Sequence, residues 1–192
     1  MQEFEAQWLD QALKGDPVAF SKLLESYQKP VYNLCYRMLG NAEDAEDASQ
    51  ETFLRAYKSM RRYDRGRSFS TWLLSIAAHY CIDQIRKRRM TVVSIEDLPV
   101  PDLPDHALGL EATVGLKEQQ RRVRALLETL DGIDRAAVIM YYWYDFSYAE
   151  ISQSLSLSES AVKSRLHRAR RAMARVWVEQ QPQMITLERI SA

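Results

Sequence analysis

The sequence contains no long hydrophobic run, only two cysteines and no excess of charge of either sign. Its apolar stretches stay well below the roughly 18 residues that a membrane-spanning helix needs, and the acidic, amphipathic N-terminus is unlike a signal peptide. Cys35 and Cys81 are too few for a disulfide framework. Each lies in an apolar helical pattern, so we expect buried, reduced thiols. Together these absences predict a cytoplasmic protein without membrane insertion.

Motifs of catalysis and metal binding are also missing. The sequence has no glycine-rich phosphate loop, nucleophile motif or paired acidic and histidine constellation, which are the signals of an enzyme such as a helical nuclease. A zinc site needs four ligands at close spacing, whereas His79 and Cys81 are separated by one residue and diverge on a helix. We therefore expect no catalytic residue, no metal and no cofactor.

The charge is balanced overall but segregated along the chain. There are 26 basic and 26 acidic residues. Residues 43–51 hold five acids and no base, residues 55–89 hold ten bases and two acids, and residues 91–115 hold five acids and no base. The overall balance is not typical of a nucleic-acid binder, so this segregation is the informative feature.

Apolar residues recur at helical spacing through almost the whole chain, which predicts an all-α fold. The expected helices cover residues 4–14, 18–28, 31–39, 42–60, 71–89, 116–130, 131–144, 148–155 and 159–178. Asp16 and Pro17 are typical of a helix start, and Pro30 is expected to kink the chain or to restart a helix.

Residues 91–115 differ from their surroundings. Three of the six prolines lie here, and every charge is negative. We interpret this segment as an acidic, proline-containing linker between two small helical domains, residues 1–90 and 116–178, with an unassigned tail at 179–192. Fully extended, the linker would reach roughly 80 Å. It contains enough apolar residues that we expect it to lie in a groove.

Residues 147–173 predict two helices separated by a tight turn. Ser147 and Glu150 have the spacing of a capping box, Ser156 and Leu157 form the turn, and Ser158 is suited to cap the second helix. Between Ser158 and Val178 there are six Lys or Arg residues and one acid. A short helix followed by a long basic helix is the plan of a DNA-binding helix-turn-helix. The alternative is a solvated basic face on an ordinary helix.

The helix expected over residues 42–60 is acidic in its first half and basic in its second. Helix-dipole matching explains part of this pattern. It does not explain Gln50, Glu51 and Phe53, which continue the acidic face and add an aromatic anchor. An exposed acidic face of this kind suits docking onto a basic partner helix.

The segment 63–89 combines aromatic and basic residues with His79 and Asp83. Flipped, single-stranded bases are held by aromatic or Arg planes and by hydrogen bonds at their exposed edges, so the segment suits single-stranded DNA. The alternative is that Phe69, Trp72 and Tyr80 belong to the core and the arginines are solvated. From the local pattern alone the two interpretations are about equal.

Taken together, three segments resemble the extracytoplasmic-function (ECF) group of bacterial sigma factors. NAEDAEDASQETFLRAY resembles that family's core-binding helix, FSTWLLSIAAHYCIDQIRKRR its −10 reading helix, and SYAEISQSLSLSESAVKSRLHRAR its −35 reading helix-turn-helix. They occur in the family's order and cover nearly the whole chain, up to about Arg175.

The resemblance implies a subunit that binds core RNA polymerase, directs promoter-specific initiation and helps to melt the −10 DNA. Polymerase contacts would come from Asp44, Asp47, Gln50, Glu51 and Phe53. Contacts to the −10 element would come from Arg65, Arg67, Phe69, Trp72, His79, Tyr80, Asp83, Arg86 and Lys87. Contacts to the duplex −35 element would come from Ser160, Lys163, Ser164, Arg165, His167, Arg168 and Arg171. An anti-sigma partner is usual in the family, and the linker is expected to thread toward the RNA path.

The sequence departs from the family pattern at three places. Asp145 and Phe146 stand where a glycine usually precedes the helix-turn-helix, and Ser156 stands at the turn glycine. The Ser156 substitution would cost stability if the turn needs a positive φ. The usual Leu-Pro before the scaffold helix reads Leu130-Asp131-Gly132.

An autonomous helix-turn-helix regulator with an N-terminal ligand or dimerisation domain is the competing interpretation. It predicts tight DNA binding as a dimer. The balanced charge, the acidic linker and the presence of one apparent DNA-reading corner per chain argue against it.

Overall fold

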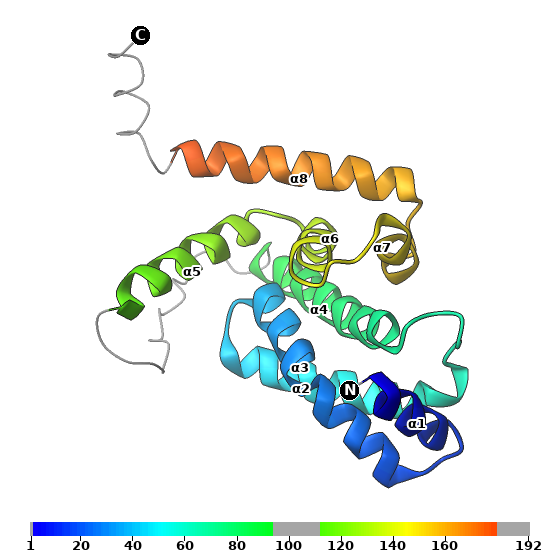
Figure 1. Cartoon of the computed structure of the whole chain (residues 1–192). Coiled ribbons are helices and arrows are strands. Elements are labelled where there is room, and N and C mark those ends of the chain that lie inside the picture. Colours follow the sequence, from blue (N-terminus) through cyan, green and yellow to red (C-terminus); the bar gives the residue numbers. More distant parts are fainter. Residues whose placement is uncertain (1, 94–111, 180–192) are drawn as a thin grey trace.

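The computed structural model describes residues 2–93 and 112–179, and every regular element within these ranges is a helix (Figure 1). The prediction of an all-α fold is confirmed. The C-terminal helix α8 runs across the top of the view, α6 and α7 lie below it, α4 occupies the middle, and α1 to α3 lie beneath α4.

The N-terminal half consists of α1 (Gln2–Leu13), α2 (Pro17–Leu39), α3 (Ala42–Ser59), a short 3₁₀ turn η1 (Met60–Arg62) and α4 (Phe69–Val93). Local signals fix most of these boundaries. The Asp16 side chain accepts from the N–H groups of Val18 and Ala19, and Gly40 ends α2 at φ 85°. Asn41 then caps α3 through the N–H of Asp44 at 2.8 Å.

Two helices of this half are longer than the sequence predicts. Helix α2 continues through Pro30 to Leu39 without a break. Of the two expected outcomes at Pro30, a kink or a new helix, the new helix was wrong. Helix α4 begins at Phe69 rather than Thr71 and reaches Val93, inside the segment interpreted as linker. The Ser68 hydroxyl accepts from the Thr71 N–H at 3.1 Å and so caps α4.

The C-terminal half consists of α5 (Ala112–Glu128), α6 (Gly132–Trp143), α7 (Tyr148–Leu155) and α8 (Glu159–Glu179). Asp131 caps α6 by accepting from the Asp134 N–H at 2.7 Å. Helix α5 begins at Ala112, so it also extends into the segment interpreted as linker. The remaining predicted linker residues, 94–111, and the tail from 180 lie outside the described residues.

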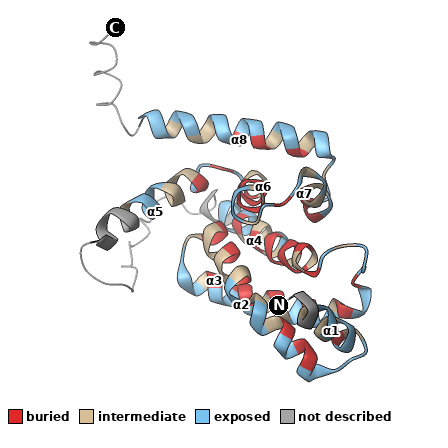
Figure 2. Cartoon of the chain, in the orientation of Figure 1, coloured by how far each residue is buried: buried red, intermediate tan, exposed pale blue. Residues whose placement is uncertain are grey.

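Helix α4 is buried on two sides, which places it at the centre of the molecule (Figure 2). On one side Leu73, Ala77 and Cys81 belong to the core that α4 forms with α2 and α3. Cys81 lies against Cys35 of α2, and the hydrogen bond between the two thiols, together with burial, raises the pKa of Cys81. Both cysteines are buried and free, as the sequence predicts.

The other side of α4 packs against α6 and α7, so the two halves share an interface. Thr71 Oγ1 lies 3.3 Å from Glu150 Oε1 of α7. At Gly132, the first residue of α6, a Cβ atom would lie 3.5 Å from the Ile82 backbone, so α6 and α4 approach closely there. Tyr144 donates to the carbonyl of Pro30 at 2.6 Å, and burial raises the pKa of its hydroxyl.

The guanidinium of Arg135 joins the two halves most directly. Its side chain is 6% exposed. It donates to Met38 O at 2.6 Å in the last turn of α2, to Glu128 O at 3.1 Å in the last residue of α5, and to Leu130 O at 3.4 Å beyond it. A cation at the carbonyl end of a helix is favoured by the helix dipole, and here one cation serves two helices.

Replacing Arg135 by Met should lower the free energy of unfolding by about 2–4 kcal/mol, because three carbonyls in buried or part-buried hydrogen bonds lose a charged donor. Urea denaturation followed by circular dichroism measures this. Arg121→Met is the matched control: its guanidinium is exposed and pairs with Glu118 on the surface, so we expect a change below about 0.5 kcal/mol. Equal stabilities of the two variants would contradict the role of Arg135.

Candidate nucleic-acid interface

Helices α7 and α8 form a two-helix corner whose turn is built as the sequence predicts. The Ser147 hydroxyl accepts from the Glu150 N–H at 3.2 Å, and Glu150 Oε2 accepts from the Ser147 N–H at 2.9 Å. These backbone and hydroxyl hydrogen bonds from Ser147 lower the pKa of the Glu150 carboxyl. The capping box is therefore confirmed, and it fixes where α7 begins.

The turn requires left-handed backbone at a non-glycine residue. Ser156 ends α7 at φ 54°, and the N–H groups of Ser156 and Leu157 both donate to Ser152 O. Asp145, two residues before the capping box, has φ 53°. These are the positive-φ non-glycine residues of the described chain. They coincide with two of the places where the sequence departs from the ECF pattern.

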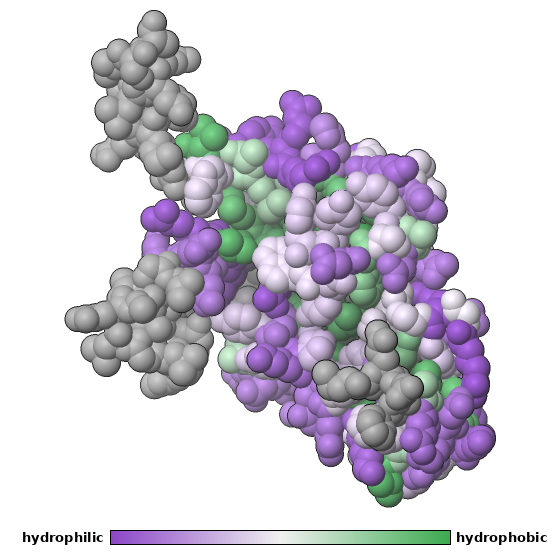
Figure 3. Space-filling view, viewed as in Figure 1, coloured by the Kyte–Doolittle hydropathy of each residue, from purple (hydrophilic) through white to green (hydrophobic). Residues whose placement is uncertain are grey.

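Helix α8 buries one face and exposes the other. Val162, Leu166 and Ala169 are buried against the scaffold. The exposed face carries the predicted −35 residues Ser160, Lys163, Ser164, His167, Arg168 and Arg171. The outer surface of α8 is mostly hydrophilic (Figure 3), and no other element covers it in Figure 1.

Three basic side chains of α8 are held by different partners. Arg168 donates to Ser164 Oγ at 2.9 Å, one turn earlier on the same exposed face. The ammonium of Lys163 lies 5.4 Å from the ring centroid of Tyr148. Arg165 turns inward to Asp134 Oδ1 at 2.6 Å. The structure therefore places Arg165 in an ion pair between α8 and α6, away from the other predicted −35 residues.

The loop before α4 presents basic groups beside a buried aromatic cluster. Arg65 pairs with Asp10 at 2.9 Å on the surface. The Arg67 nitrogens Nε and Nη2 have no hydrogen-bond partner, while its carbonyl accepts from the Tyr63 hydroxyl at 2.5 Å. Phe69 is 3% exposed. It packs against Tyr63 and Trp72.

The predicted role of Phe69 as a −10 contact does not fit this placement, since a buried ring cannot stack on a base. The core interpretation holds for this aromatic residue. Trp72 and Tyr80 are half-buried and keep part of their rings accessible.

The remaining predicted −10 residues follow one another along α4. His79 is exposed, with Nδ1 2.8 Å from Ser75 O. Asp83 accepts from Arg86 at 3.1 Å, and the guanidinium of Arg55 lies 4.9 Å from the centroid of the Tyr80 ring. Lys87 is exposed. Polar and aromatic groups therefore share an exposed side of α4, which lies between its two buried faces.

Helix α3 presents the predicted docking residues unevenly. Asp47 and Gln50 are exposed, whereas Phe53 is half-buried against the core. Glu51 accepts from Arg55 at 2.7 Å. Asp44 pairs with Arg88 of α4, so this carboxylate already has a partner within the chain.

Two further residues on the same helix, both apolar, were not predicted from the sequence. Leu54 is 54% exposed and Tyr57 is 60% exposed. They lie four and seven positions after Gln50 and so share its face. Their signal is large apolar side chains at helical spacing from the acidic residues, which a charge-based search passes over.

Comparison with known protein families shows which family these surfaces are part of. Residues 23–91 match the Sigma-70 region 2 family and residues 120–173 match the Sigma-70 region 4 family. The chain is 36% identical over 173 residues to the ECF RNA polymerase sigma factor SigW of Bacillus subtilis (strain 168), covering 86% of this chain and 92% of SigW. This chain belongs to the ECF sigma factors.

A second relative agrees. This sigma factor is 30% identical over 152 residues to SigX of the same organism, with 78% of each chain covered. The resemblance drawn from the three sequence segments is thereby confirmed. Sigma factors are specificity subunits for transcription initiation and not enzymes, and their regions 2 and 4 bind promoter elements.

Solved structures share the fold of this sigma factor. One is CnrH in complex with the cytosolic domain of CnrY, with TM-score 0.67 and 22% identity, covering 91% of this chain and 97% of that one. Another is the sigma factor RpoE in complex with the anti-sigma factor NepR from Bartonella quintana, with TM-score 0.64 and 22% identity, covering 82% and 96%.

Across residues 2–93 and 112–179, no helix combines the length and apolarity needed to cross a membrane. The same residues contain no cluster of three or more potential metal ligands.

Replacing Ser156 by Gly should raise the free energy of unfolding by about 1 kcal/mol, because a side chain in left-handed backbone is strained. Urea denaturation of the full chain measures this. Gln153→Gly, in the interior of α7, is the control and should lower stability by about 0.5–1 kcal/mol. A loss of stability in both variants would show that the turn is not strained.

Proposed function

We propose that this ECF sigma factor reads the −35 element with α8 and the −10 element with α4 and its preceding loop, while α3 docks it onto core RNA polymerase. The observation that carries the proposal is the exposed basic face of α8 on a helix-turn-helix, in a chain that also carries region 2 in the family's order. The protein works in the cytoplasm, where polymerase and chromosome are found.

The −35 contact set is narrower than the sequence implied. We assign base reading to Lys163, Ser164, His167 and Arg168, which share the exposed face of α8 near its N-terminal end. Side chains of this kind form hydrogen bonds to base edges in the major groove. Arg171, further along the helix, is suited to a phosphate contact, as is Ser160 at the start. Arg165 is a structural residue of the interface with α6.

For the −10 element we assign base contacts to His79, Tyr80, Asp83 and Trp72, with Arg65, Arg67, Arg86 and Lys87 supporting the strand. Support comes from the exposed side chains of Arg65, Arg86 and Lys87, whereas Nε and Nη2 of Arg67 are buried without a hydrogen-bond partner and would have to move to reach DNA. Half-exposed rings offer stacking surfaces for unpaired bases. Phe69 acts behind them, by packing against Trp72 at 5.5 Å between ring centroids.

For docking we assign α3, with Asp47, Gln50 and Glu51 as polar contacts and Leu54 and Tyr57 as added apolar contacts. The exposed fractions of Leu54 and Tyr57 support this extension. An apolar patch beside charged groups is the composition of a specific protein interface. Phe53 supports the helix from beneath, and Asp44 holds α3 to α4 through Arg88.

A relative of the same fold, RpoE, was solved with its anti-sigma factor NepR. By analogy, we infer that a protein inhibitor of this class binds this sigma factor. The competing proposal, an autonomous regulator, is disfavoured by the match of residues 23–91 to region 2 rather than to a ligand-binding or dimerisation domain.

We further infer that the two halves separate on promoter binding. The −35 and −10 elements are, by their names, about 25 base pairs apart, which is roughly 85 Å along DNA at about 3.4 Å per base pair. We call the arrangement in this structure, with the two halves in contact, the closed arrangement. In it α4 contacts α7, and α7 contacts α8. Packed helices lie about 8–10 Å apart, so the two reading helices are far too close. Residues 94–111 could span at most about 60 Å if fully extended. This length, added to the dimensions of the two halves, is enough to reach both promoter elements.

Run-off transcription with bacterial core polymerase and a genomic promoter library tests the proposed function. Start sites that appear only with this protein and share a two-box motif are the expected result.

Lys163→Ala with Arg168→Ala should lose the −35 preference, since each base contact is worth about 1–3 kcal/mol. Asp47→Lys with Glu51→Lys should reduce transcription from every promoter. Tight dimeric binding to DNA without new transcripts would favour the autonomous regulator.

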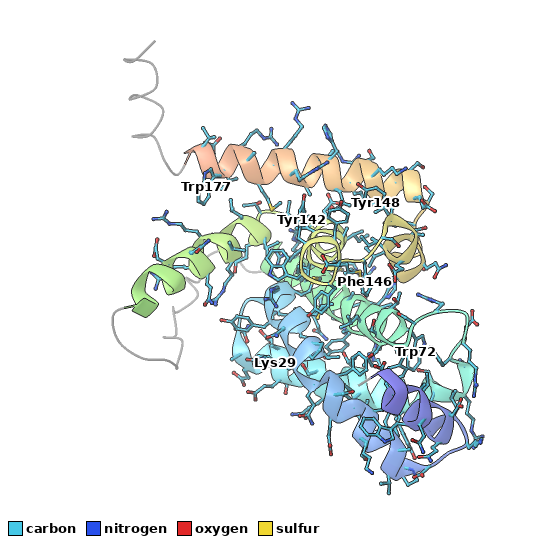
Figure 4. All side chains as sticks on the ribbon, in the orientation of Figure 1. Lys29, Trp72, Tyr142, Phe146, Tyr148 and Trp177 are labelled. Atoms are coloured by element: carbon cyan, nitrogen blue, oxygen red, sulfur yellow. The ribbon has the colours of Figure 1, made fainter. Side chains whose placement is uncertain are left out.

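Fluorescence energy transfer tests the separation. Lys29 of α2 and Ala174 of α8 are exposed sites for labelled cysteines (Lys29 in Figure 4), whereas Cys35 and Cys81 are buried. Transfer should be high in the free protein and fall when core polymerase and promoter are added. A Lys29 and Lys58 pair, within the N-terminal half, should not change. Equal transfer from the first pair in the promoter complex would contradict the inference.

A further inference from the structure

Aromatic residues gather along one flank of the recognition helix α8. Tyr141 and Tyr142 come from α6, and Tyr148 is the first residue of α7. The rings of Tyr141 and Tyr148 are stacked, with centroids 5.5 Å apart and planes 9° from parallel. Tyr142 meets Tyr141 edge-on at 4.9 Å. Figure 4 shows Tyr148 below α8, on the side of the helix that faces α6 and α7.

The position of Tyr148 is determined by two independent constraints. The capping box of Ser147 and Glu150 fixes the start of α7, and Tyr148 follows Ser147 directly. The stacked ring of Tyr141 then fixes the ring plane. The neighbouring Tyr148 hydroxyl is the main reason why the pKa of Tyr141 is raised, which agrees with the close stacking of the two rings. Tyr148 is thus a rigid platform rather than a mobile surface ring.

Lys163 of α8 lies on this platform. Its ammonium is 5.4 Å from the Tyr148 centroid, within the roughly 6 Å range of a cation–π interaction. Among residues 2–93 and 112–179, Lys163 has no salt bridge to a carboxylate. The aromatic face is therefore what restricts this long, flexible side chain.

Two other basic residues of α8 are restricted by different groups. Arg168 is held by Ser164 Oγ at 2.9 Å, and Arg165 by Asp134 Oδ1 at 2.6 Å. A side chain that is already ordered loses less conformational entropy when it binds. Because Lys163 is the fifth residue of α8, it lies at the end of the recognition helix that contacts base edges in helix-turn-helix proteins.

We propose that Tyr148, backed by Tyr141, is a positioning residue that holds the Lys163 ammonium for base reading and so sets the preference at one position of the −35 element. This rests on the proposed function of α8. Tyr148 itself need not touch DNA. Its contribution is to specificity, because it restricts which base edge the ammonium meets.

A double-mutant cycle tests the coupling. Tyr148→Leu keeps apolar bulk but removes the ring, Tyr148→Phe keeps the ring, and Lys163→Ala removes the cation. Each variant directs run-off transcription with core polymerase from templates that carry every single-base change in the −35 element. Discrimination is the ratio of transcription from the best and the worst base at each position.

Tyr148→Leu should lower discrimination about threefold to tenfold, the size of a cation–π interaction. Lys163→Ala removes the base contact itself and should lower discrimination at the same position about fivefold to a hundredfold. The double variant should be no worse than Lys163→Ala alone. Tyr148→Phe should retain the wild-type preference. Arg168→Ala is the matched control: since Ser164 holds Arg168, its effect should multiply with that of Tyr148→Leu.

Three results would overturn the proposal. Multiplying losses in the Tyr148→Leu, Lys163→Ala double variant would show that the two residues act separately. A uniform loss across all −35 sequences, with a lower melting temperature, would make Tyr148 a packing residue only. Equal behaviour of Tyr148→Phe and Tyr148→Leu would exclude the ring face. Failure of the proposed function looks different, because the wild-type protein would then direct no specific transcription.

Discussion

The hydrogen bonds of Arg135 are the constraint on which the closed arrangement of this sigma factor depends. A buried guanidinium is costly unless its donors are used. Here Nη1 and Nη2 find acceptors at the ends of α2 and α5, one in each half, while Nε has no partner. Arg89 of α4 adds a second guanidinium at Leu130 O. Backbone carbonyls are acceptors of fixed position, so these contacts set the distance between the halves. Burial lowers the pKa of Arg135, and the nearby Glu128 opposes this shift.

Helix α4 carries the consequences. One side completes the core with α2 and α3, another receives α6 and α7, and the strip between them carries the polar residues assigned to the −10 element. Thr71 contacts Glu150 of α7, and Gly132 of α6 lies close to the backbone of Ile82, so α6 and α7 both approach α4 closely. The same helix thus belongs to the core of region 2 and also holds region 4. The proposed separation of the halves would expose polar hydrogen-bonding groups such as Thr71, Glu150 and Arg135, which water can satisfy.

Strain and restraint are distributed unevenly over the helix-turn-helix. The turn accepts left-handed backbone at Ser156, where a glycine would be relaxed. The capping box on the other side of α7 offsets part of this cost with two reciprocal hydrogen bonds. On α8, three basic side chains each have their own restraint: a ring for Lys163, a hydroxyl for Arg168 and a carboxylate for Arg165. Reading a base pair requires a few side chains to be ordered before DNA arrives, and these contacts supply that order.

Local chemistry was sufficient for much of this protein. Helix caps at Asp16, Asn41 and Ser147, apolar periodicity, and the charge segregation of α3 and α8 determined the helices, the corner and the family, because each depends on residues close in sequence. Local patterns did not determine that α2 passes through Pro30, that Phe69 is buried or that Arg165 turns inward to Asp134. Nor did they reveal Arg135 between two helix ends, or Lys163 over the stacked tyrosines. These features depend on which distant element packs against each side chain, and only the tertiary structure decides that.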